Sequence, residues 1–369
     1  MRVGVVLEQL LAPVPGGTGR YTGELAAALA RTAVGDDSVR GFIARHRDVD
    51  GIAIPGLAAP TRLPLPRRAL AATWELGLGP APQGVDLVHA PTQLFPPRRS
   101  PLVVTIHDTV AWTHPQTLTR RGARWHRATA ARAARVADAI TVPTRAVADE
   151  LARQVRRFPA ERVHVLGAGV TPALRREPSD EEIARVLAQF ELPERFVLTV
   201  ATLEPRKGLD IALRALARLG STAVALLVVG APGWGDVDVM ASAHAAGLTE
   251  QQIRVLGRIA DPDLAVILRR ATALLMPSRA EGFGLPVIEA MACGTAVICS
   301  DVPALVEVAG DAALVTPVGD VARLAEAIEA VVGDTQLREG LVRAGRLRVP
   351  RYDWNAVAER AWRLYHSLA

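Results

Sequence analysis

The chain has 369 residues and a mass of 39.2 kDa, enough for two ordinary domains or one large one. Hydrophobic residues make up 50% and charged residues 22%, so the chain can bury enough apolar surface to offset the entropy of ordering. Length and composition therefore exclude a small disulfide-stapled scaffold and a globally disordered chain.

The net charge of +5 is unevenly distributed along the chain. Residues 1–170 carry 22 basic and 13 acidic side chains, whereas residues 171–369 carry 21 and 25. This asymmetry predicts that the first half meets an anionic partner. Nucleic acid is a poor candidate, because aromatic residues make up only 4% of the chain and no nucleic-acid-binding motif is present.

The chain opens on an apolar run followed by Glu8, without the pattern of a signal peptide, and no uncharged apolar run is long enough to span a membrane. The two cysteines, Cys293 and Cys299, stand in apolar sequence and are expected to be buried free thiols in a reducing compartment. These features predict a cytoplasmic protein.

Short apolar runs rich in β-branched residues alternate with helical or loop-like stretches, which predicts βαβ units around parallel sheets. The first expected strands are 3–7, 102–106, 139–142 and 163–166. After a polar stretch at 175–180 the pattern restarts, and the later expected strands are 196–200, 223–229, 253–256, 273–276, 296–298 and 313–315.

This restart predicts an α/β protein with two doubly wound domains, over residues 1–172 and 175–350. Residues 353–369 read as a closing amphipathic helix. Ligands of such sheets bind outside the carboxyl ends of the strands, so we expect two domains facing a cleft that holds the substrate.

The glycine-rich segment Pro15-Gly16-Gly17-Thr18-Gly19 follows the first expected strand and precedes a helix. Backbone N–H groups in such a turn can approach a phosphate or a sugar. The segment lacks the full GxGxxG spacing and the chain has no P-loop, which disfavours a dehydrogenase or an NTPase. A plain tight turn is the alternative interpretation.

His107 directly follows the strand expected at 102–106. At the carboxyl end of a parallel strand its ring is expected to reach the substrate and to donate a hydrogen bond to a hydroxyl or another oxygen. A hydrogen-bonded core histidine is the alternative.

Residues 120–137 carry six arginines that share one arc of a helix, opposite a row of alanines. A solvated helix face is one interpretation, and a surface for anionic lipid or a phosphate-bearing acceptor is the other. The six are Arg120, Arg121, Arg124, Arg127, Arg132 and Arg135.

Lys207 is the only lysine among the 43 basic residues, and it stands beside Arg206 after the strand expected at 196–200. A planar guanidinium next to a compact ammonium suits a diphosphate, because one clamps two oxygens and the other brings a movable point charge to the leaving group. A solvated turn is the alternative.

The strand expected at 273–276 leads into a loop with two glycines and then into a helix with a proline near its start. The N–H groups of Phe283, Gly284 and Leu285 are expected to point, with the helix dipole, toward an anion or sugar oxygens. Glu281 before the helix and Glu289 inside it can accept hydrogen bonds from a sugar and from a ribose.

Three Asp-x-Asp triplets, at 48–50, 236–238 and 261–263, match a metal-binding pattern. Three matches in one ordinary chain indicate a high rate of false positives, and no neighbouring His or Glu completes a set of oxygen ligands. We therefore expect neither a catalytic metal nor another cofactor.

Together, these segments and Gly257-Arg258-Ile259 resemble glycosyltransferase family 4, whose members are retaining enzymes of the GT-B fold. The likeness spans nearly the whole chain, and its most specific part is the segment from Glu281 to Glu289 with Gly-Phe-Gly-Leu-Pro inside it. The resemblance implies two Rossmann-like domains, with a nucleotide-sugar donor held mainly by the second and an acceptor mainly by the first.

The resemblance also implies roles for particular residues. It assigns Arg206 and Lys207 to the donor diphosphate, Glu281 to hydroxyls of the transferred sugar and Glu289 to the ribose. Further implied contacts are Gly16 and Gly17 with the phosphates, His107 with the transferred sugar, Arg258 and Ile259 with the base, and the backbone of Phe283, Gly284 and Leu285 with sugar and phosphates.

The segments 204–207 and 107–135 look most like mannosyltransferase-type members that assemble surface polysaccharide or glycolipid. GDP-mannose is therefore the first expected donor and a UDP-hexose the second, with a glycan, a lipid-linked sugar or another hydroxyl as acceptor. Gly208 stands where many members have Asn, and Thr144 where Ser is common. A non-catalytic nucleotide-sugar binder and a nucleotide-sugar epimerase on the same fold are the alternatives.

Overall fold

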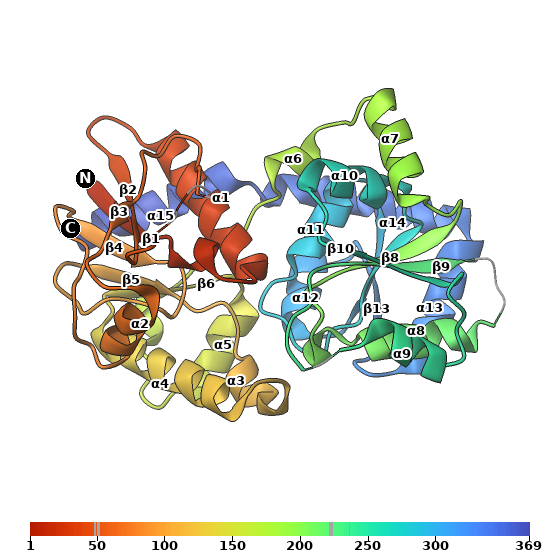
Figure 1. The fold of residues 1–369 in the computed structure, drawn as a ribbon, viewed down its shortest axis with the longest axis horizontal. Helices are drawn as coiled ribbons and strands as arrows, with labels where there is room; N and C mark the ends of the chain where they lie inside the picture. The colour runs from red at the N-terminus through yellow and green to blue at the C-terminus, as the bar shows by residue number, and fades with distance from the viewer. Residues whose placement is uncertain (48, 50–51, 221–223, 236) are drawn as a thin grey trace. The chain divides into compact units, whose positions relative to one another are not determined.

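The computed structural model divides into two compact units (Figure 1). Unit 1 comprises Met1–Ala168 and Asp353–Ala369, and unit 2 comprises Gly169–Tyr352. The structure describes residues 1–47, 49, 52–220, 224–235 and 237–369. The boundary lies slightly before the predicted one, because the backbone N–H of Val170 donates to the carbonyl of Tyr352 at 3.1 Å and so ties this segment to the end of unit 2.

Unit 1 is a parallel sheet covered by helices. Within the described residues the sheet has seven strands, in the order β3-β2-β1-β4-β5-β6-β7. The strands are β1 (Arg2–Val6), β2 (Ser38–Ile43), β3 (Thr61–Arg62), β4 (Leu87–Ala90), β5 (Leu102–Thr105), β6 (Ala139–Val142) and β7 (Val163–Val165). The helices are α1 (Gly16–Thr32), α2 (Arg67–Glu75), α3 (Val110–Thr113), α4 (Arg120–Val136), α5 (Arg145–Gln154) and α15 (Trp354–Leu368), with short 3-10 turns at Glu8–Leu11, Pro115–Thr117 and Ala160–Arg162.

The sequence analysis did not predict three strands of this sheet, β2, β3 and β4. β3 is a two-residue edge strand, and the first half of β2 is largely exposed, so neither has a continuous apolar run. β4 is fully buried but carries His89, whose Nδ1 lies 2.6 Å from the Tyr365 hydroxyl and whose Nε2 lies 2.8 Å from Oγ1 of Thr105. The polar ring of His89 can be buried in the core because each of its nitrogens has a hydrogen-bond partner from a distant part of the sequence.

The two ends of the chain build unit 1 together. Helix α15 packs along α1, and the indole N–H of Trp362 donates to the carbonyl of Leu29 at 3.3 Å (Figure 1). Asp353 caps α15 by accepting from the backbone N–H of Asn355 and Ala356. The helix buries Trp354 and Tyr365, so the last residues of the chain contribute to the core of the unit that the first residues begin.

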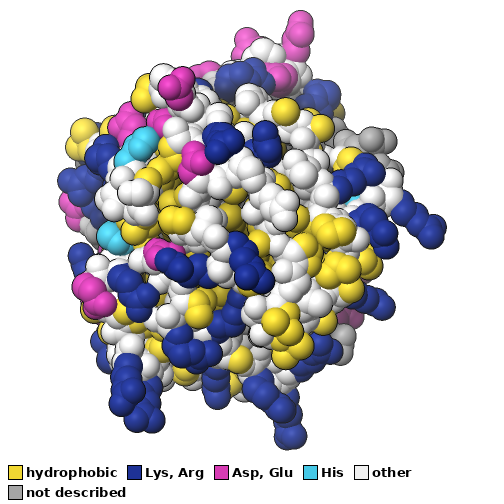
Figure 2. Space-filling view, turned by 90° about the vertical axis from the view of Figure 1, so that its left-hand side faces the viewer, with side chains coloured by type: hydrophobic (Ala, Val, Ile, Leu, Met, Phe, Trp, Pro, Cys, Tyr) yellow, Lys and Arg dark blue, Asp and Glu magenta, His cyan; other side chains and the backbone are white. Residues whose placement is uncertain are grey.

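The arginine-rich stretch forms helix α4 (Arg120–Val136), but one of its arginines lies differently from the expectation. Arg132 is half-buried: its guanidinium lies 4.0 Å from the ring centroid of Phe95 and donates to the carbonyl of Trp74 at 2.6 Å. Arg132 therefore belongs to the packing of unit 1 and not to a solvated face, because a guanidinium can bury its plane against a ring while it satisfies buried carbonyls. The other five arginines of α4 are exposed, and Figure 2, which looks onto unit 1, shows Arg side chains spread over this face with apolar side chains between them.

Unit 2 is a second parallel sheet. Within the described residues it has six strands, in the order β10-β9-β8-β11-β12-β13. They are β8 (Phe196–Val200), β9 (Ala225–Val229), β10 (Ile253–Gly257), β11 (Ala273–Met276), β12 (Ala296–Ser300) and β13 (Leu314–Thr316). The helices are α6 (Pro172–Arg175), α7 (Asp180–Phe190), α8 (Leu209–Arg218), α9 (Val239–Ala245), α10 (Asp261–Arg270), α11 (Leu285–Ala292), α12 (Pro303–Ala309), α13 (Val321–Gly333) and α14 (Thr335–Arg348), with 3-10 turns at Pro205–Lys207 and Val349–Arg351.

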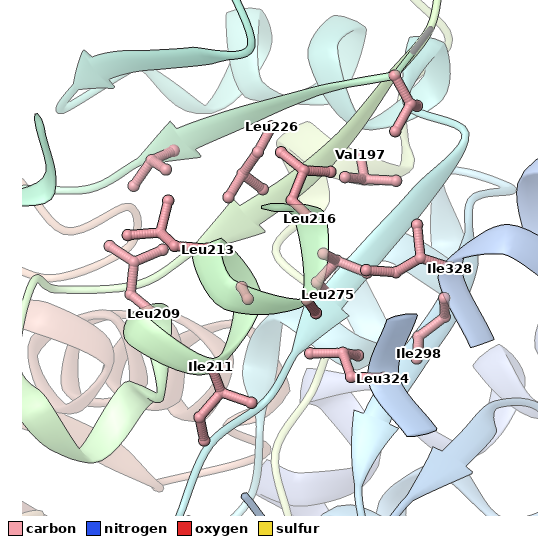
Figure 3. Packing of buried hydrophobic residues seen from close by; sticks show 14 of the residues in the cluster. Val197, Leu209, Ile211, Leu213, Leu216, Leu226, Leu275, Ile298, Leu324 and Ile328 are labelled. Atoms are coloured by element: carbon pink, nitrogen blue, oxygen red, sulfur yellow. The ribbon is translucent and has the colours of Figure 1, made fainter. Parts of the chain in front are cut away.

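The core of unit 2 holds the loops of one sheet edge in position. Leu213 and Leu216 of α8 pack over Leu226 of β9, and Ile328 of α13 packs near Ile298 of β12 (Figure 3). The strand order reverses between β8 and β11, which are direct neighbours. In open parallel sheets this reversal leaves a crevice at the carboxyl ends of the two strands, where ligands bind.

Both cysteines are free and buried, as predicted. Burial raises the pKa of the Cys293 thiol and of the Cys299 thiol to about 12, so both stay protonated at neutral pH. In the part of the chain that the structure describes, every helix is too short or too polar to cross a membrane.

Candidate functional site

The loops that follow β8 and β11 bring together side chains that lie some 70 residues apart in sequence. The loop after β8 continues into the 3-10 turn Pro205–Lys207, and the loop after β11 runs from Pro277 to the start of α11. The backbone N–H of Arg279 donates to the carbonyl of Arg206 at 2.8 Å and joins the two loops.

Gly208 allows these loops to approach so closely. It has a φ of 68°, and a Cβ atom there would lie 2.0 Å from the carbonyl oxygen of Pro277. Asparagine, which many family members have at this position, tolerates a positive φ but would not fit against that carbonyl. The close approach of this pair of loops therefore requires glycine in this chain.

Glu281 lies at the centre of a cluster of charged side chains, the Glu281 cluster, which also comprises Glu204, Arg206 and Lys207. Its Oε1 accepts from the Lys207 ammonium at 2.6 Å and from the Ser278 hydroxyl at 2.8 Å, and its Oε2 accepts from the Arg206 guanidinium at 3.1 Å. The Glu281 side chain is only 7% exposed. Burial by itself would raise its pKa, but Lys207 and Arg206 outweigh that effect and lower the pKa to about 2.

Glu204 is the second carboxylate of the cluster, and the sequence offered no role for it beyond its place in the motif. Its side chain is 1% exposed and forms an ion pair with Arg206 at 2.5 Å. Two partly buried cations, Arg206 and Lys207, thus face two buried carboxylates, Glu204 and Glu281. The expected cationic pocket is in fact charge-balanced, because a buried charge without a counter-charge would be costly.

A further ion pair, between Arg279 and Asp210, lies next to this cluster and was also not predicted. Arg279 donates to both carboxylate oxygens of Asp210, at 2.8 and 2.7 Å, and to the carbonyl of Pro205 at 2.9 Å. This bidentate pair links the loop after β11 to the first turn of α8 and orients Arg206 through the backbone.

The glycine loop ends at helix α11, as predicted. Gly284 has a φ of 93°, and a Cβ atom there would lie 2.4 Å from the side chain of Leu305, so this position also requires glycine. Phe283 is buried and lies edge-on to Tyr352, and Leu285 is the first residue of the helix. The first turn of α11 thus stands beside the Glu281 cluster along the chain.

Three further donor-side predictions fall on the same unit. Glu289 lies in the second turn of α11 and is 3% exposed. Arg258 is exposed and Ile259 is half-buried, and both follow β10 at the carboxyl edge of the sheet. A hollow of about 530 Å³ lies at that edge, lined among others by Leu203 and Val255.

His107 belongs to unit 1, where it follows β5. Its Nε2 lies 2.7 Å from the carbonyl oxygen of Pro91, and a carbonyl can only accept, so Nε2 carries the proton. Burial lowers the pKa of His107, and the ring is neutral at pH 7. Nδ1 is therefore an acceptor, and a substrate hydroxyl would donate to it, which reverses the expected direction of that hydrogen bond.

Gly16 and Gly17 are exposed and form the first turn of α1, whereas the sequence predicts a loop before the helix here. Gly16 has a φ of 60°, and a Cβ atom at Gly19 would lie 2.4 Å from Cβ of Pro15, which explains two of the three glycines in this segment. Tyr21 of the same helix lies edge-on to the ring of His107, with centroids 4.7 Å apart.

Two aspartates of the Asp-x-Asp triplets have structural roles in the described part of the chain. Asp238 caps α9, and Asp263 pairs with Arg185 at 2.5 Å. Asp48, Asp50 and Asp236 lie outside the described residues. Among the described residues, no group of three or more His, Cys, Asp or Glu is arranged to hold a metal ion.

Comparison with known proteins identifies the family. The model of Glycosyltransferase Family 4 matches residues 15–174, and the model of Glycosyl transferases group 1 matches residues 180–348. O-antigen chain mannosyltransferase B of Escherichia coli is 31% identical over 273 residues, which cover 73% of this chain and 71% of that protein. The chain therefore belongs to glycosyltransferase family 4, as the motifs predicted.

A second relative matches a shorter part of the chain. Phosphatidyl-myo-inositol mannosyltransferase of Mycobacterium leprae is 40% identical over 171 residues, 45% of this chain and 44% of that protein. Among solved structures, sucrose-phosphate synthase from Thermosynechococcus elongatus has a TM-score of 0.79 at 24% identity and covers 100% of this chain and 99% of its own. Anabaena Alr3699/HepE in complex with UDP-glucose has a TM-score of 0.77 at 22% identity, with both chains fully covered. These likenesses confirm the GT-B fold class.

Proposed function

We propose that this glycosyltransferase is a retaining hexosyltransferase that moves a hexose, mannose as first choice, from a nucleoside-diphosphate sugar to a hydroxyl acceptor. The observation that supports this most is the meeting of Arg206, Lys207 and Glu281 after β8 and β11, where the strand order of the sheet reverses. A crevice at this point of a parallel sheet is the usual place for a nucleotide ligand.

In the proposed reaction the bond between the anomeric carbon and the donor phosphate breaks, and its electron pair leaves with the diphosphate. Arg206 clamps two phosphate oxygens, and Lys207 brings its ammonium to the departing oxygen. Preorganised charges stabilise such developing negative charge, and the N–H groups at the start of α11 add to them. The acceptor hydroxyl attacks the same face and gives its proton to the departing phosphate, so the anomeric configuration is retained.

Glu281 has two tasks in this proposal. Before donor binds, it holds Lys207 and Arg206 in place at low energetic cost, because its charge and that of Glu204 together balance theirs. When the diphosphate takes over part of these contacts, Glu281 accepts hydrogen bonds from hydroxyls of the transferred sugar. The positive charges of Lys207 and Arg206 supply the stabilisation that a metal ion provides elsewhere, so the proposed reaction is metal-independent.

We also propose the remaining donor contacts as the sequence predicts them. Glu289 is proposed for the ribose. The backbone of Phe283, Gly284 and Leu285 is proposed for the sugar and phosphates, Arg258 and Ile259 for the base, Gly16 and Gly17 for the phosphates, and His107 for a sugar hydroxyl that donates to its Nδ1.

GDP-mannose is the proposed donor and a UDP-hexose the second candidate. Both relatives described above are mannosyltransferases by name, which supports mannose, whereas the structural neighbour solved with UDP-glucose supports the second. A thermal-shift screen against a panel of nucleotide sugars tests the choice, since a ligand that binds the folded state raises the melting temperature.

The experiment that tests the mechanism is the Lys207→Ala variant, assayed with the donor found by that screen. We expect a loss of about 30-fold in kcat/KM, or about 2 kcal/mol, because a contact to the departing phosphate is removed. Arg323→Ala, an exposed arginine of the same unit, is the control and should leave turnover unchanged. Near-normal turnover of Lys207→Ala would overturn the mechanism.

Two alternatives are outcomes of the same assay. An enzyme of the proposed kind slowly releases nucleoside diphosphate from its donor even without acceptor, whereas a non-catalytic binder does not. An epimerase changes the sugar and needs no acceptor, and NMR of the products distinguishes it from a transferase. NMR also reads the anomeric configuration and so tests retention.

We propose a lipid-linked or other phosphate-bearing acceptor and contact of unit 1 with an anionic membrane surface, which would place the protein at the inner face of the membrane. The exposed arginines of α4 support this, since unit 1 has a net charge of +9. Wild-type protein should sediment with phosphatidylglycerol vesicles and be released by high salt. Arg121→Gln/Arg124→Gln should bind less than Arg323→Gln/Arg351→Gln, and equal binding of the two would refute the assignment.

A further inference from the structure

Unit 2 has a second hollow, at the sheet edge opposite the Glu281 cluster. It has a volume of about 570 Å³ and lies at the amino ends of the strands, where Arg195 directly precedes β8 and Thr272 directly precedes β11. Among the described residues, its charged lining consists of one acid, Glu339, and six arginines: Arg195, Arg269, Arg270, Arg338, Arg343 and Arg346.

The charge of this hollow contrasts with that of the unit around it. Unit 2 as a whole has a net charge of −4, whereas the lining of the hollow has a net charge of +5. Like charges that converge in one place repel each other, so such a cluster destabilises the fold unless its members have partners. The partners therefore distinguish structural arginines from those available to a ligand.

Three of the arginines have structural partners. Arg195 donates to the carbonyl of Val332 at 2.8 Å, and Arg338 donates to the carbonyl of Val331 at 2.8 Å, so both cap the end of α13. Arg269 donates to the carbonyls that precede α7 and forms an ion pair of 3.2 Å with Glu177. These three are part of the packing of the unit.

The other three arginines of the hollow, Arg270, Arg343 and Arg346, indicate a binding site for a ligand. Among the residues that the structure describes, no carboxylate lies within ion-pair distance of Arg270 or Arg346. Arg343 has only a loose contact of 3.7 Å with Glu339, and both side chains are more than 60% exposed, so this pair contributes little. Favourable interaction with the helix dipole explains an arginine in the last turn of α10 or α14, but it does not explain why the three line one hollow.

Glycine at position 294 keeps the hollow open beside Arg346. Gly294 has a φ of 73°, and a Cβ atom there would lie 2.9 Å from a guanidinium nitrogen of Arg346. The guanidinium thus lies against bare backbone at the wall of the hollow, with its donors available for an anion. Guanidinium groups bind phosphate oxygens through paired N–H donors, and several together suit a chain of phosphate groups.

We propose that this hollow is a second anion site, which binds a molecule with two or three linked phosphate groups through Arg270, Arg343 and Arg346. Its volume is in the range of small-molecule sites. The site is separate from the proposed donor site, since the two lie at opposite edges of one sheet. A ligand here would bind unit 2 without competing with the donor for Lys207.

Calorimetric titration of the full chain with inorganic tripolyphosphate tests the proposal. Arg270→Gln/Arg346→Gln should weaken binding about tenfold or more, because charge-assisted hydrogen bonds are lost. Arg323→Gln/Arg351→Gln removes the same charge from exposed positions of the same unit and should have little effect. Lys207→Gln should leave this binding in place, which separates it from tripolyphosphate bound at the donor site.

Three results would overturn the proposal: equal weakening by the two arginine pairs, loss of binding in Lys207→Gln, or no binding of tripolyphosphate at 0.1 M salt. If Arg270→Gln/Arg346→Gln fails to fold, the single variant Arg343→Gln replaces it, since this exposed side chain lies outside the packing of the unit. A nucleoside triphosphate is titrated in parallel, and binding as tight as that of tripolyphosphate supports recognition through the phosphates alone.

Discussion

Glu281→Gln tests the charge balance of the candidate site, because glutamine keeps the shape of the side chain and removes its negative charge. The pKa of Glu281 falls from an ordinary value of 4.5 to about 2, through Lys207 and Arg206. Such a shift corresponds to about 3 kcal/mol of folding free energy at pH 7. Since glutamine resembles the protonated acid, we expect unit 2 to lose about this amount in the variant.

The pH dependence follows from the direction of the shift. The folded pKa lies below the unfolded one, so the contribution of Glu281 is complete above about pH 4.5 and disappears as the pH falls toward 2. At pH 3 about 2 kcal/mol of it should be gone. The wild-type protein and the Glu281→Gln variant should therefore differ most near neutral pH and converge in acid.

The assay must report on unit 2 by itself, because a chain of two compact units need not unfold in one cooperative step. Hydrogen exchange of β8 and β11, followed by mass spectrometry, gives the free energy of opening of these strands. Glu326→Gln is the matched control: it also removes a carboxylate from an ion pair, 2.8 Å from Arg323, but that pair is exposed and should contribute less than about 1 kcal/mol. If Glu281→Gln and Glu326→Gln destabilise equally at pH 7, the reasoning from burial and charge is refuted.

Three further substitutions or titrations test other parts of the structure. In urea unfolding, Gly208→Ala should lower stability by about 3 kcal/mol or more, and the control Gly247→Ala by about 1–2 kcal/mol. Both glycines have a positive φ, but only a Cβ atom at Gly208 would clash with backbone, so equal losses would contradict this reasoning. Arg132→Ala should cost about 2 kcal/mol in a thermal melt and Arg135→Ala less than about 0.5 kcal/mol, and the reverse order would refute the inward packing of the former. Burial lowers the pKa of His89 to about 3, so the unfolded chain takes up a proton at this residue at a higher pH than the folded chain does. Unit 1 should therefore lose about 1.4 kcal/mol of stability per pH unit as the pH falls below 6. Urea unfolding followed by tryptophan fluorescence measures this loss, and constant stability between pH 7 and 5 would disprove it.

Much of unit 2 was predictable because its strands are buried on both faces. The run at 273–276 is entirely apolar and the run at 196–200 has Thr199 as its one polar residue, and the structure has strands with these same bounds. The ends of such strands identify the loops that carry function, so Arg206, Lys207 and Glu281 could be selected before their contacts were known. The missed strands of unit 1 are those whose apolar pattern is broken by exposure or by His89.

The amino-acid sequence by itself determined the fold class, the family and the positions where polar residues follow buried strands, since these depend on local pattern and spacing. Only the tertiary structure decided which charges meet: Glu204 and Glu281 balance Arg206 and Lys207, Arg132 turns inward, and the Nε2–H of His107 is taken up by the carbonyl of Pro91. Those outcomes depend on partners far away in the chain, and no local pattern encodes the distance between two side chains that only folding brings together.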